Sequence, residues 1–165
     1  MKYIFKLTLL TAIFLMSAQF GYSCSCLQTD IKQEVKNTDF IFVGKVVEIT
    51  EDKSFVPPKL ARVSASIQKM VDTRKRYIIK FKVEKKFKGV EESEINLVKY
   101  EQENSPCEGL SFEQEKTYLI YAGKGKEEVT DNGLCSRTKP FDEKSKDYKE
   151  LLSLKIRKQI KTKKS

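Results

Sequence analysis

The sequence contains no histidine among its 165 residues. This absence excludes zinc sites with histidine ligands, Ser-His-Asp triads and Cys-His dyads. Cysteine is also scarce, and the chain has four: Cys24, Cys26, Cys107 and Cys135. Since the thiolate is the form that binds metal, pairing of these cysteines as disulfides would leave no metal site of the chain's own. We therefore expect no resident metal, no cofactor and no enzyme activity.

Long hydrophobic runs are lacking as well. The one nearly unbroken apolar run, Leu7 to Met16, is shorter than the roughly 20 residues that a membrane-spanning helix needs. Lys2 and Lys6 flank its start, and Gly21 and Ser23 supply small side chains at the third and first positions before Cys24. This pattern is typical of a cleavable export signal. We predict that residues 1–23 are removed and that the mature chain begins at Cys24, in the extracellular space or the periplasm.

Lipidation of Cys24 is the alternative outcome of export. An acylated Cys24 would anchor the chain to a membrane and could not pair with another cysteine. The residues before it, Gly21-Tyr22-Ser23, lack the leucine and small residue usually found before a lipidated cysteine. We therefore favour an unmodified Cys24.

The four cysteines of an exported domain are expected to form two disulfides. A bond between Cys24 and Cys26 would close a strained ring across one residue. Two pairings remain, and both fasten the Cys24-Ser25-Cys26 segment to two distant points, Cys107 and Cys135. The residues alone do not choose between them.

The chain is basic, with 32 Lys and Arg against 23 Asp and Glu. Removing residues 1–23 takes away two lysines and no acid, so the mature chain of 142 residues has a charge of 30 − 23 = +7. The tail from Lys155 to Lys164 holds six of the basic residues: Lys155, Arg157, Lys158, Lys161, Lys163 and Lys164. Such a run is typical of a solvated chain end. The alternative is attraction to an anionic surface.

Most of the mature chain has the composition of short strands separated by turns. The expected strands are Asp39–Thr50, Arg76–Phe87, Glu94–Tyr100, Lys116–Ala122 and Lys126–Asp131. Gly44 is placed where a bend or bulge would fall, and turns are expected at Lys88-Gly89 and Asn132-Gly133. In the second strand the apolar residues alternate with charged ones, which predicts that Tyr77, Ile79, Phe81 and Val83 face inward. This rhythm favours an antiparallel barrel or sandwich.

Three segments do not follow this pattern of short strands separated by turns. Ile31–Thr38 is expected to form a short helix, with Asp30 as its cap. Glu51–Lys75 contains Pro57-Pro58 and is either an extended hairpin projecting from the barrel or a mobile loop. Asp142–Ile160 is expected to form a helix whose apolar face packs on the barrel or forms a docking site, with the residues Tyr148, Leu151, Leu152, Ile156 and Ile160. The predicted organisation is a domain at 24–141 followed by a helix and basic tail at 142–165.

Several stretches, in order along the chain, resemble the N-terminal, netrin-like domain of the tissue inhibitors of metalloproteinases. They are Cys24-Ser25-Cys26, Thr38 to Val46, Phe81 to Gly89, Ser105 to Leu110 with Lys116 to Ile120, and Leu134 to Thr138. A match to any one of these stretches is weak evidence for the family, whereas the whole set in this order is fairly specific for it. The chain is similar to a short form of this domain with two disulfides, because it lacks the cysteine that animal members carry shortly after Cys-x-Cys and lacks their C-terminal subdomain.

The resemblance implies a mainly β fold, a five-stranded OB-fold-like Greek-key barrel with a short N-terminal and a C-terminal helix. It implies the pairs Cys24–Cys107 and Cys26–Cys135. It also implies that the α-amine and carbonyl oxygen of mature Cys24 bind the catalytic zinc of a target protease, with Ser25 in the specificity pocket. The remaining contacts implied are Cys26, Leu27, Asn104, Ser105 and Pro106.

Netrin-like domains also occur in proteins that inhibit no protease. A non-inhibitory module that binds a protein, a glycan or an envelope surface is therefore the alternative function. Nucleic-acid binding is not expected, because the chain is exported and lacks an aromatic stacking platform among its polar strand positions. We expect a monomer.

Overall fold

The computed structural model describes residues 26, 30–102, 109–126 and 128–163, with the backbone alone at residues 70, 134 and 156–163. The predicted export signal lies outside these ranges. Within them, no helix is long and apolar enough to cross a membrane.

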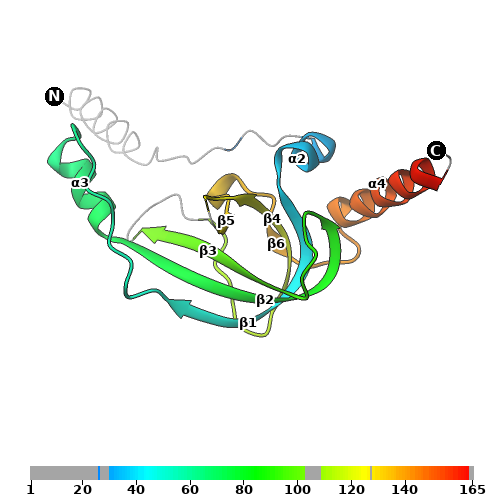
Figure 1. Ribbon diagram of the computed structural model, residues 1–165, viewed down its shortest axis with the longest axis horizontal. Helices are drawn as coiled ribbons and strands as arrows, with labels where there is room; N and C mark the ends of the chain where they lie inside the picture. The colour runs from blue at the N-terminus through cyan, green and yellow to red at the C-terminus, as the bar shows by residue number, and fades with distance from the viewer. Residues whose placement is uncertain (1–25, 27–29, 103–108, 127, 164–165) are drawn as a thin grey trace, which may run out of the picture.

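The core of the molecule is a closed five-stranded β-barrel of OB-like topology (Figure 1). Its strands are paired in the order β1, β2, β3, β5, β4, and pairing of β1 with β4 closes the ring. All of these pairs are antiparallel except β3 with β5. The strands are β1 (Phe40–Glu51), β2 (Arg74–Lys88), β3 (Glu94–Gln102), β4 (Thr117–Lys124) and β5 (Val129–Asp131). The predicted fold class is confirmed.

A further strand, β6 (Lys139–Pro140), pairs with β4 outside the ring. The sequence did not predict it, because two residues that include a proline carry no strand pattern. The fifth strand is also shorter than predicted, since the chain from Lys126 to Glu128 precedes its pairing.

Strand β1 closes the barrel because it bends. It pairs with β2 from Ile41 to Glu51 and with β4 from Phe40 to Lys45, so its first half serves both neighbours. Its register with β2 shifts at three places, one of them between Val43 and Gly44. Such bulges bend a strand and increase its twist. The predicted irregularity at Gly44 is therefore confirmed.

The barrel interior holds the larger of two apolar clusters. The four inward residues predicted from the alternation in β2 all belong to this cluster or pack against it: Tyr77, Ile79, Phe81 and Val83. Phe81 is fully buried, and its ring meets those of Phe42 and Phe112 edge-on at centroid distances of 5.8 and 5.4 Å. The period-two interpretation of this strand is confirmed.

The second apolar cluster lies between the outside of the barrel and two helices, α2 (Ile31–Asn37) and α4 (Lys146–Lys163). Tyr148 and Leu151 of α4 are buried in it, whereas Leu152 is 37% exposed. The prediction that Leu152 shares the packed face was wrong, because one residue further along a helix is rotated by about 100°.

The ends of the helices agree with expectation in part. Helix α2 begins at Ile31 with Asp30 at its N-cap, as predicted, but the Asp30 side chain makes no capping hydrogen bond. Helix α4 begins at Lys146 rather than at Asp142, because Asp142 closes a turn in which its backbone oxygen accepts from Ser145 N. The expected turn at Asn132-Gly133 leads directly into a 3-10 helix, η1 (Gly133–Cys135).

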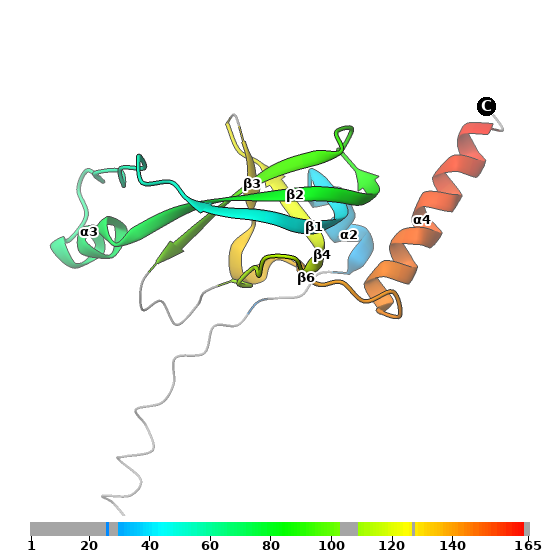
Figure 2. The same ribbon diagram turned by 90° about the horizontal axis from the view of Figure 1, so that it is seen from below.

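Strands β1 and β2 continue beyond the barrel as a long hairpin, paired as far as Glu51 with Tyr77. Its connection contains a helix, α3 (Ala65–Asp72), whose first turn is capped by Ser64 Oγ, which accepts from the backbone N–H of Ile67. The extended-hairpin alternative is therefore the one observed, and the helix inside it was missed. Figures 1 and 2 show α3 and α4 at opposite ends of the molecule.

Two glycines with positive φ provide a matched test of this fold. Gly89 (φ 69°) follows β2, and a Cβ there would lie 2.2 Å from the backbone oxygen of Asp39; Gly133 (φ 70°) has no atom within 4 Å of its Cβ position. Gly133→Ala should lower the free energy of unfolding by about 1–2 kcal/mol, because alanine disfavours the left-handed conformation. Gly89→Ala should lower the free energy of unfolding by clearly more, because the backbone at Asp39 must also move to make room for the Cβ. Urea unfolding of both variants would show equal losses if the β2–β3 turn did not contact the start of β1.

Candidate functional site

A disulfide joins Cys26 to Cys135, with Sγ atoms 2.10 Å apart and Cα atoms 5.3 Å apart. It is one of the two bridges that the resemblance implies. It attaches the chain two residues after Cys24 to the 3-10 helix η1. The second bridge, Cys24–Cys107, involves two residues outside the described ranges and stays a prediction.

The parallel pairing of β3 with β5 decides what else lies near η1. Leu97 pairs with Val129 and Val98 with Thr130, so both strands run toward the same edge of the barrel. Strand β5 ends at Asp131 and leads into η1, and β3 ends at Gln102. We call this edge, marked by Cys26, Gln102, Asp131 and Cys135, the anchor edge. Strand β3 therefore ends at the edge that holds Cys26, and Asn104, Ser105 and Pro106, which follow in the sequence, lie outside the described residues.

The long hairpin starts from the same edge. Arg74, the first residue of β2, pairs with Gln102, the last residue of β3. Helix α3 immediately precedes Arg74 in the chain. Three described parts of the chain that are far apart in sequence thus meet at the anchor edge: Cys26, the end of β3 and the start of the hairpin.

The residues after Cys135 are bound to β4 by side chains. Ser136 Oγ and Thr138 Oγ1 both donate to the backbone oxygen of Tyr121, at 3.0 and 3.2 Å, and Thr138 Oγ1 accepts from the Tyr121 N–H at 2.9 Å. Arg137 pairs with Asp147 of α4 at 2.9 Å. The three residues that follow Cys135 are therefore fixed to β4 and α4 by hydrogen bonds and an ion pair, which restricts the position of Cys135. The sequence offered no pattern from which these roles could be predicted.

Asp131, the last residue of β5, carries a titratable group at the anchor edge. Burial raises its pKa to about 6, although the charge of Lys99 and the backbone N–H groups of Gly133 and Asn132 act in the opposite direction. Lys99 is itself 3% exposed and pairs with Glu101 at 2.5 Å. Asp131 thus combines a half-buried carboxyl group with hydrogen bonds from the backbone N–H groups at the start of η1. An Asp-Asn-Gly sequence before a cysteine was the signal that could have identified it.

An ion-pair network fixes the base of the hairpin. Arg76 of β2 bonds to Asp52, just beyond β1, and to Glu128, just before β5. Glu128 also accepts a hydrogen bond from Tyr100 Oη of β3 at 3.0 Å. The ring of Tyr100 lies 5.4 Å from that of Phe55 in the hairpin connection. The direction of the hairpin is therefore set by contacts to two strands that end at the anchor edge.

The hairpin connection exposes several large apolar side chains. Val56 is 81% exposed and Ile67 of α3 47%, and the others are Leu60 and Val63. A group of exposed apolar residues on a projecting element is typical of a protein-contact surface.

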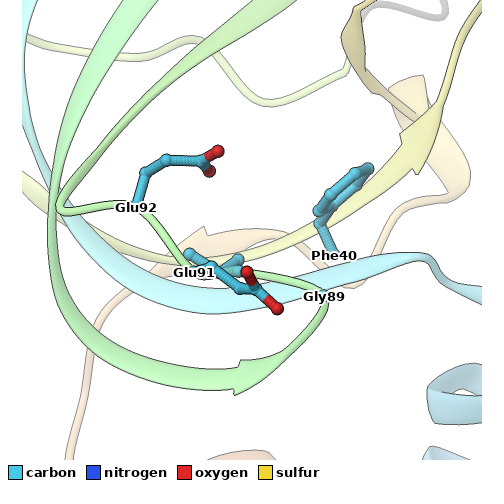
Figure 3. Close-up of a pocket in the computed structure, with 5 residues that line it drawn as sticks. Phe40, Gly89, Glu91 and Glu92 are labelled. Carbon is cyan, nitrogen blue, oxygen red and sulfur yellow. The ribbon is translucent and has the colours of Figure 1, made fainter.

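A shallow pocket lies at the other end of β2 and β3. It is lined by Phe40, Gly89, Val90, Glu91 and Glu92, and Figure 3 shows the two glutamates on the β2–β3 turn with the Phe40 ring on the neighbouring strand. No residue predicted to belong to the site lines it. In the described part of the chain, no cluster of three Cys, Asp or Glu side chains could hold a metal ion.

Of the predicted site residues, the structure describes Cys26 alone. Cys24, Ser25, Leu27, Asn104, Ser105 and Pro106 lie outside the described residues. Their roles stay predictions. The described residues next to them in the sequence, Cys26 and Gln102, lie at the anchor edge.

Most of the chain matches a known protein family. The sequence profile of the family described as "Tissue inhibitor of metalloproteinase" matches residues 22–162, which is most of the chain. A search of curated protein sequences found no match.

Replacing Asp131 by asparagine should change how stability depends on pH. The folded-state pKa of about 6 exceeds the ordinary 3.8, so the contribution of Asp131 is fully present below pH 4 and is lost as the pH rises through 6. This pKa difference corresponds to about 3 kcal/mol. Asp131→Asn should therefore gain stability relative to the parent between pH 4 and pH 7.5, by up to about 3 kcal/mol.

The measurement is urea unfolding of parent and variant across that pH range. The readout is how the difference in the free energy of unfolding between variant and parent changes with pH. Its value at a single pH does not decide, because any destabilisation caused by the amide side chain is the same at every pH. Asp30→Asn is the control at an exposed carboxylate without a side-chain capping bond. A pH-independent difference for Asp131→Asn would contradict the assigned burial.

Proposed function

The chain belongs to the tissue inhibitor of metalloproteinase family, and on that basis we propose that it is an exported inhibitor of zinc metalloproteinases. The observation that carries the proposal is the Cys26–Cys135 bridge, which attaches the N-terminal segment to the anchor edge. A protease would be blocked by this edge of the barrel, and the chain would perform no reaction itself.

The proposed inhibitory group is the N-terminus of mature Cys24. A catalytic zinc keeps one coordination position open for water or substrate. A terminal amine has a pKa of about 7.7–8.0, so a substantial neutral fraction is available as a ligand near neutral pH. The amine and the carbonyl oxygen of Cys24 would occupy the zinc together, and Ser25 would enter the pocket for a substrate side chain.

Preorganisation is the physical advantage of the bridge. A flexible peptide that binds a protease cleft loses backbone and side-chain freedom, which reduces its affinity. Here Cys26 is covalently fixed two residues from the amine, and η1 is fixed in turn by the contacts of Ser136 and Thr138 to β4. The predicted Cys24–Cys107 bridge would remove most of the freedom that remains.

The contact surface would extend to both sides of the N-terminus. In the sequence, Leu27 follows Cys26 directly and Asn104, Ser105 and Pro106 come soon after Gln102, and the hairpin starts beside Gln102. Its exposed apolar side chains, Val56 and Ile67 among them, would supply a second patch against the protease. The network around Arg76 would hold this patch at a fixed direction from the anchor edge.

Extending the N-terminus by one residue tests the mechanism. For protein whose intact mass shows Cys24 as the first residue, one alanine added before Cys24 should abolish inhibition across a panel of secreted zinc metalloproteinases, because the amine moves away from the metal. Acetylation of the amine should do the same by removing the lone pair. One alanine added after Ser165 is the matched control and should leave inhibition unchanged.

The urea midpoint of the extended protein should equal that of the parent, because the extension alters neither the barrel nor the bridges. If the extended form inhibits equally well, or if authentic protein inhibits nothing on the panel, the chain is a non-inhibitory netrin-like binding module.

Ser25 should determine target preference. Ser25→Leu should change the inhibition constants by about tenfold or more, in different directions for proteases with large and small pockets. Thermal stability should not change. Ser93→Leu, at an exposed position at the opposite end of β3 from Gln102, is the matched control. Equal effects of the two substitutions on every protease would exclude Ser25 from the pocket.

A further inference from the structure

The described side chains of helix α4 that contact the barrel lie in its first half. Tyr148 and Leu151 are buried in the outer apolar cluster, and Lys155 Nζ donates to the backbone oxygen of Lys86 at 2.9 Å. The helix continues to Lys163, about 12 Å further at 1.5 Å per residue. Figure 2 shows this second half extending beyond the barrel.

The charge of α4 is strongly asymmetric along its length. Its acids, Asp147 and Glu150, lie in the packed half, where Asp147 is paired with both Arg137 and Lys139. After Lys155, whose ammonium group bonds to the barrel, the rest of the sequence holds five Lys and Arg and no Asp or Glu. The extending half is therefore a concentrated positive charge without internal compensation.

An apolar row accompanies this charge. Leu152 is 37% exposed, in contrast to the adjacent Leu151 at 3%. Positions 156 and 160, both isoleucine, follow Leu152 at intervals of four residues, and each lies about 40° further around the helix from the packed face than the one before. A basic helix with an apolar row off its packed face is typical of a helix that lies in the interface of a membrane.

We propose that the extending half of α4 binds the surface of an anionic phospholipid bilayer. The basic residues would be attracted to the lipid headgroups, and the row that begins at Leu152 would enter the boundary between headgroups and acyl chains. A sulfated polysaccharide would satisfy the charge but would leave that row in water, and for this reason the lipid is favoured. The proposal is independent of protease inhibition, because α4 lies at the opposite end of the molecule from α3.

Vesicle binding tests the proposal. The purified protein is titrated with vesicles of phosphatidylcholine alone or with one-third phosphatidylglycerol, in low and high salt. Binding should require the anionic lipid and weaken with salt. The triple variant Arg157→Gln, Lys158→Gln and Lys161→Gln should bind about a hundredfold more weakly. Parent and variants are compared in one purified form, so that any lipid affinity of Leu7 to Met16 is common to all.

Two matched controls separate the tail from general charge and hydrophobicity. The triple variant Lys53→Gln, Lys59→Gln and Lys69→Gln removes the same charge from exposed positions of the hairpin and should bind nearly as the parent does. Leu152→Gln should weaken vesicle binding about tenfold, whereas Ile67→Gln, at the exposed apolar position of α3, should not. Both apolar variants should keep the urea midpoint of the parent.

Three outcomes would overturn the proposal. An equal loss of vesicle binding in the two triple variants would show that anionic lipid attracts this basic protein non-specifically. Unchanged vesicle binding by Leu152→Gln, together with tight and tail-dependent binding to heparin, would identify the surface as a polyanion site. Absence of binding to anionic vesicles by the parent would show that the tail is merely solvated.

Discussion

The bond between Cys26 and Cys135 is the constraint on which the arrangement of the site depends. It spans 109 positions of the sequence, and closing a loop of about that length stabilises a fold by about 4–5 kcal/mol in the chain-entropy description. Its structural effect is more specific, because the parallel strands β3 and β5 end at the edge where η1 holds Cys135. The bond therefore assigns the N-terminal segment to one edge of a barrel that has several.

At the anchor edge, residues held by several hydrogen bonds and ion pairs lie next to one acidic group whose charge lowers stability. Side chains rather than a continuous strand hold the chain after Cys135, and the hairpin base is fixed through Arg76. Against this, Asp131 is a half-buried acid whose pKa is raised to about 6. Its acceptor oxygens serve the backbone N–H groups that begin η1, and this offers a reason for a half-buried acid there. An apolar residue would avoid the cost of the charge but would leave two N–H groups without that acceptor.

The sequence predicted those features that repeat at short range. Alternation along Tyr77 to Val83 predicted the buried face of β2, and Gly44 predicted an irregularity in β1. Helix α3 was missed because its eight residues lie in a proline-containing connection with weak periodicity, and Leu152 was misplaced because a broad apolar run does not define the centre of the packed face. The contacts of Arg76, Asp131 and Thr138 were beyond prediction, since their partners lie on different strands or helices and are fixed only once the barrel closes. The bridge between Cys26 and Cys135 was available through the family resemblance, not through the spacing of the cysteines.

The separation of the two proposed surfaces has a physical consequence. The hairpin and α4 lie at opposite ends of the molecule (Figure 1), so a chain bound to lipid through α4 would keep the hairpin directed away from the membrane. Confinement to a surface raises the effective concentration of one binding partner for another that shares the surface, without any new contact between them. An inhibitor with modest intrinsic affinity could then act on proteases at the same membrane while leaving those in free solution largely active. The basic tail would thus contribute to selectivity by location, whereas Ser25 would contribute to it by the shape of the protease pocket.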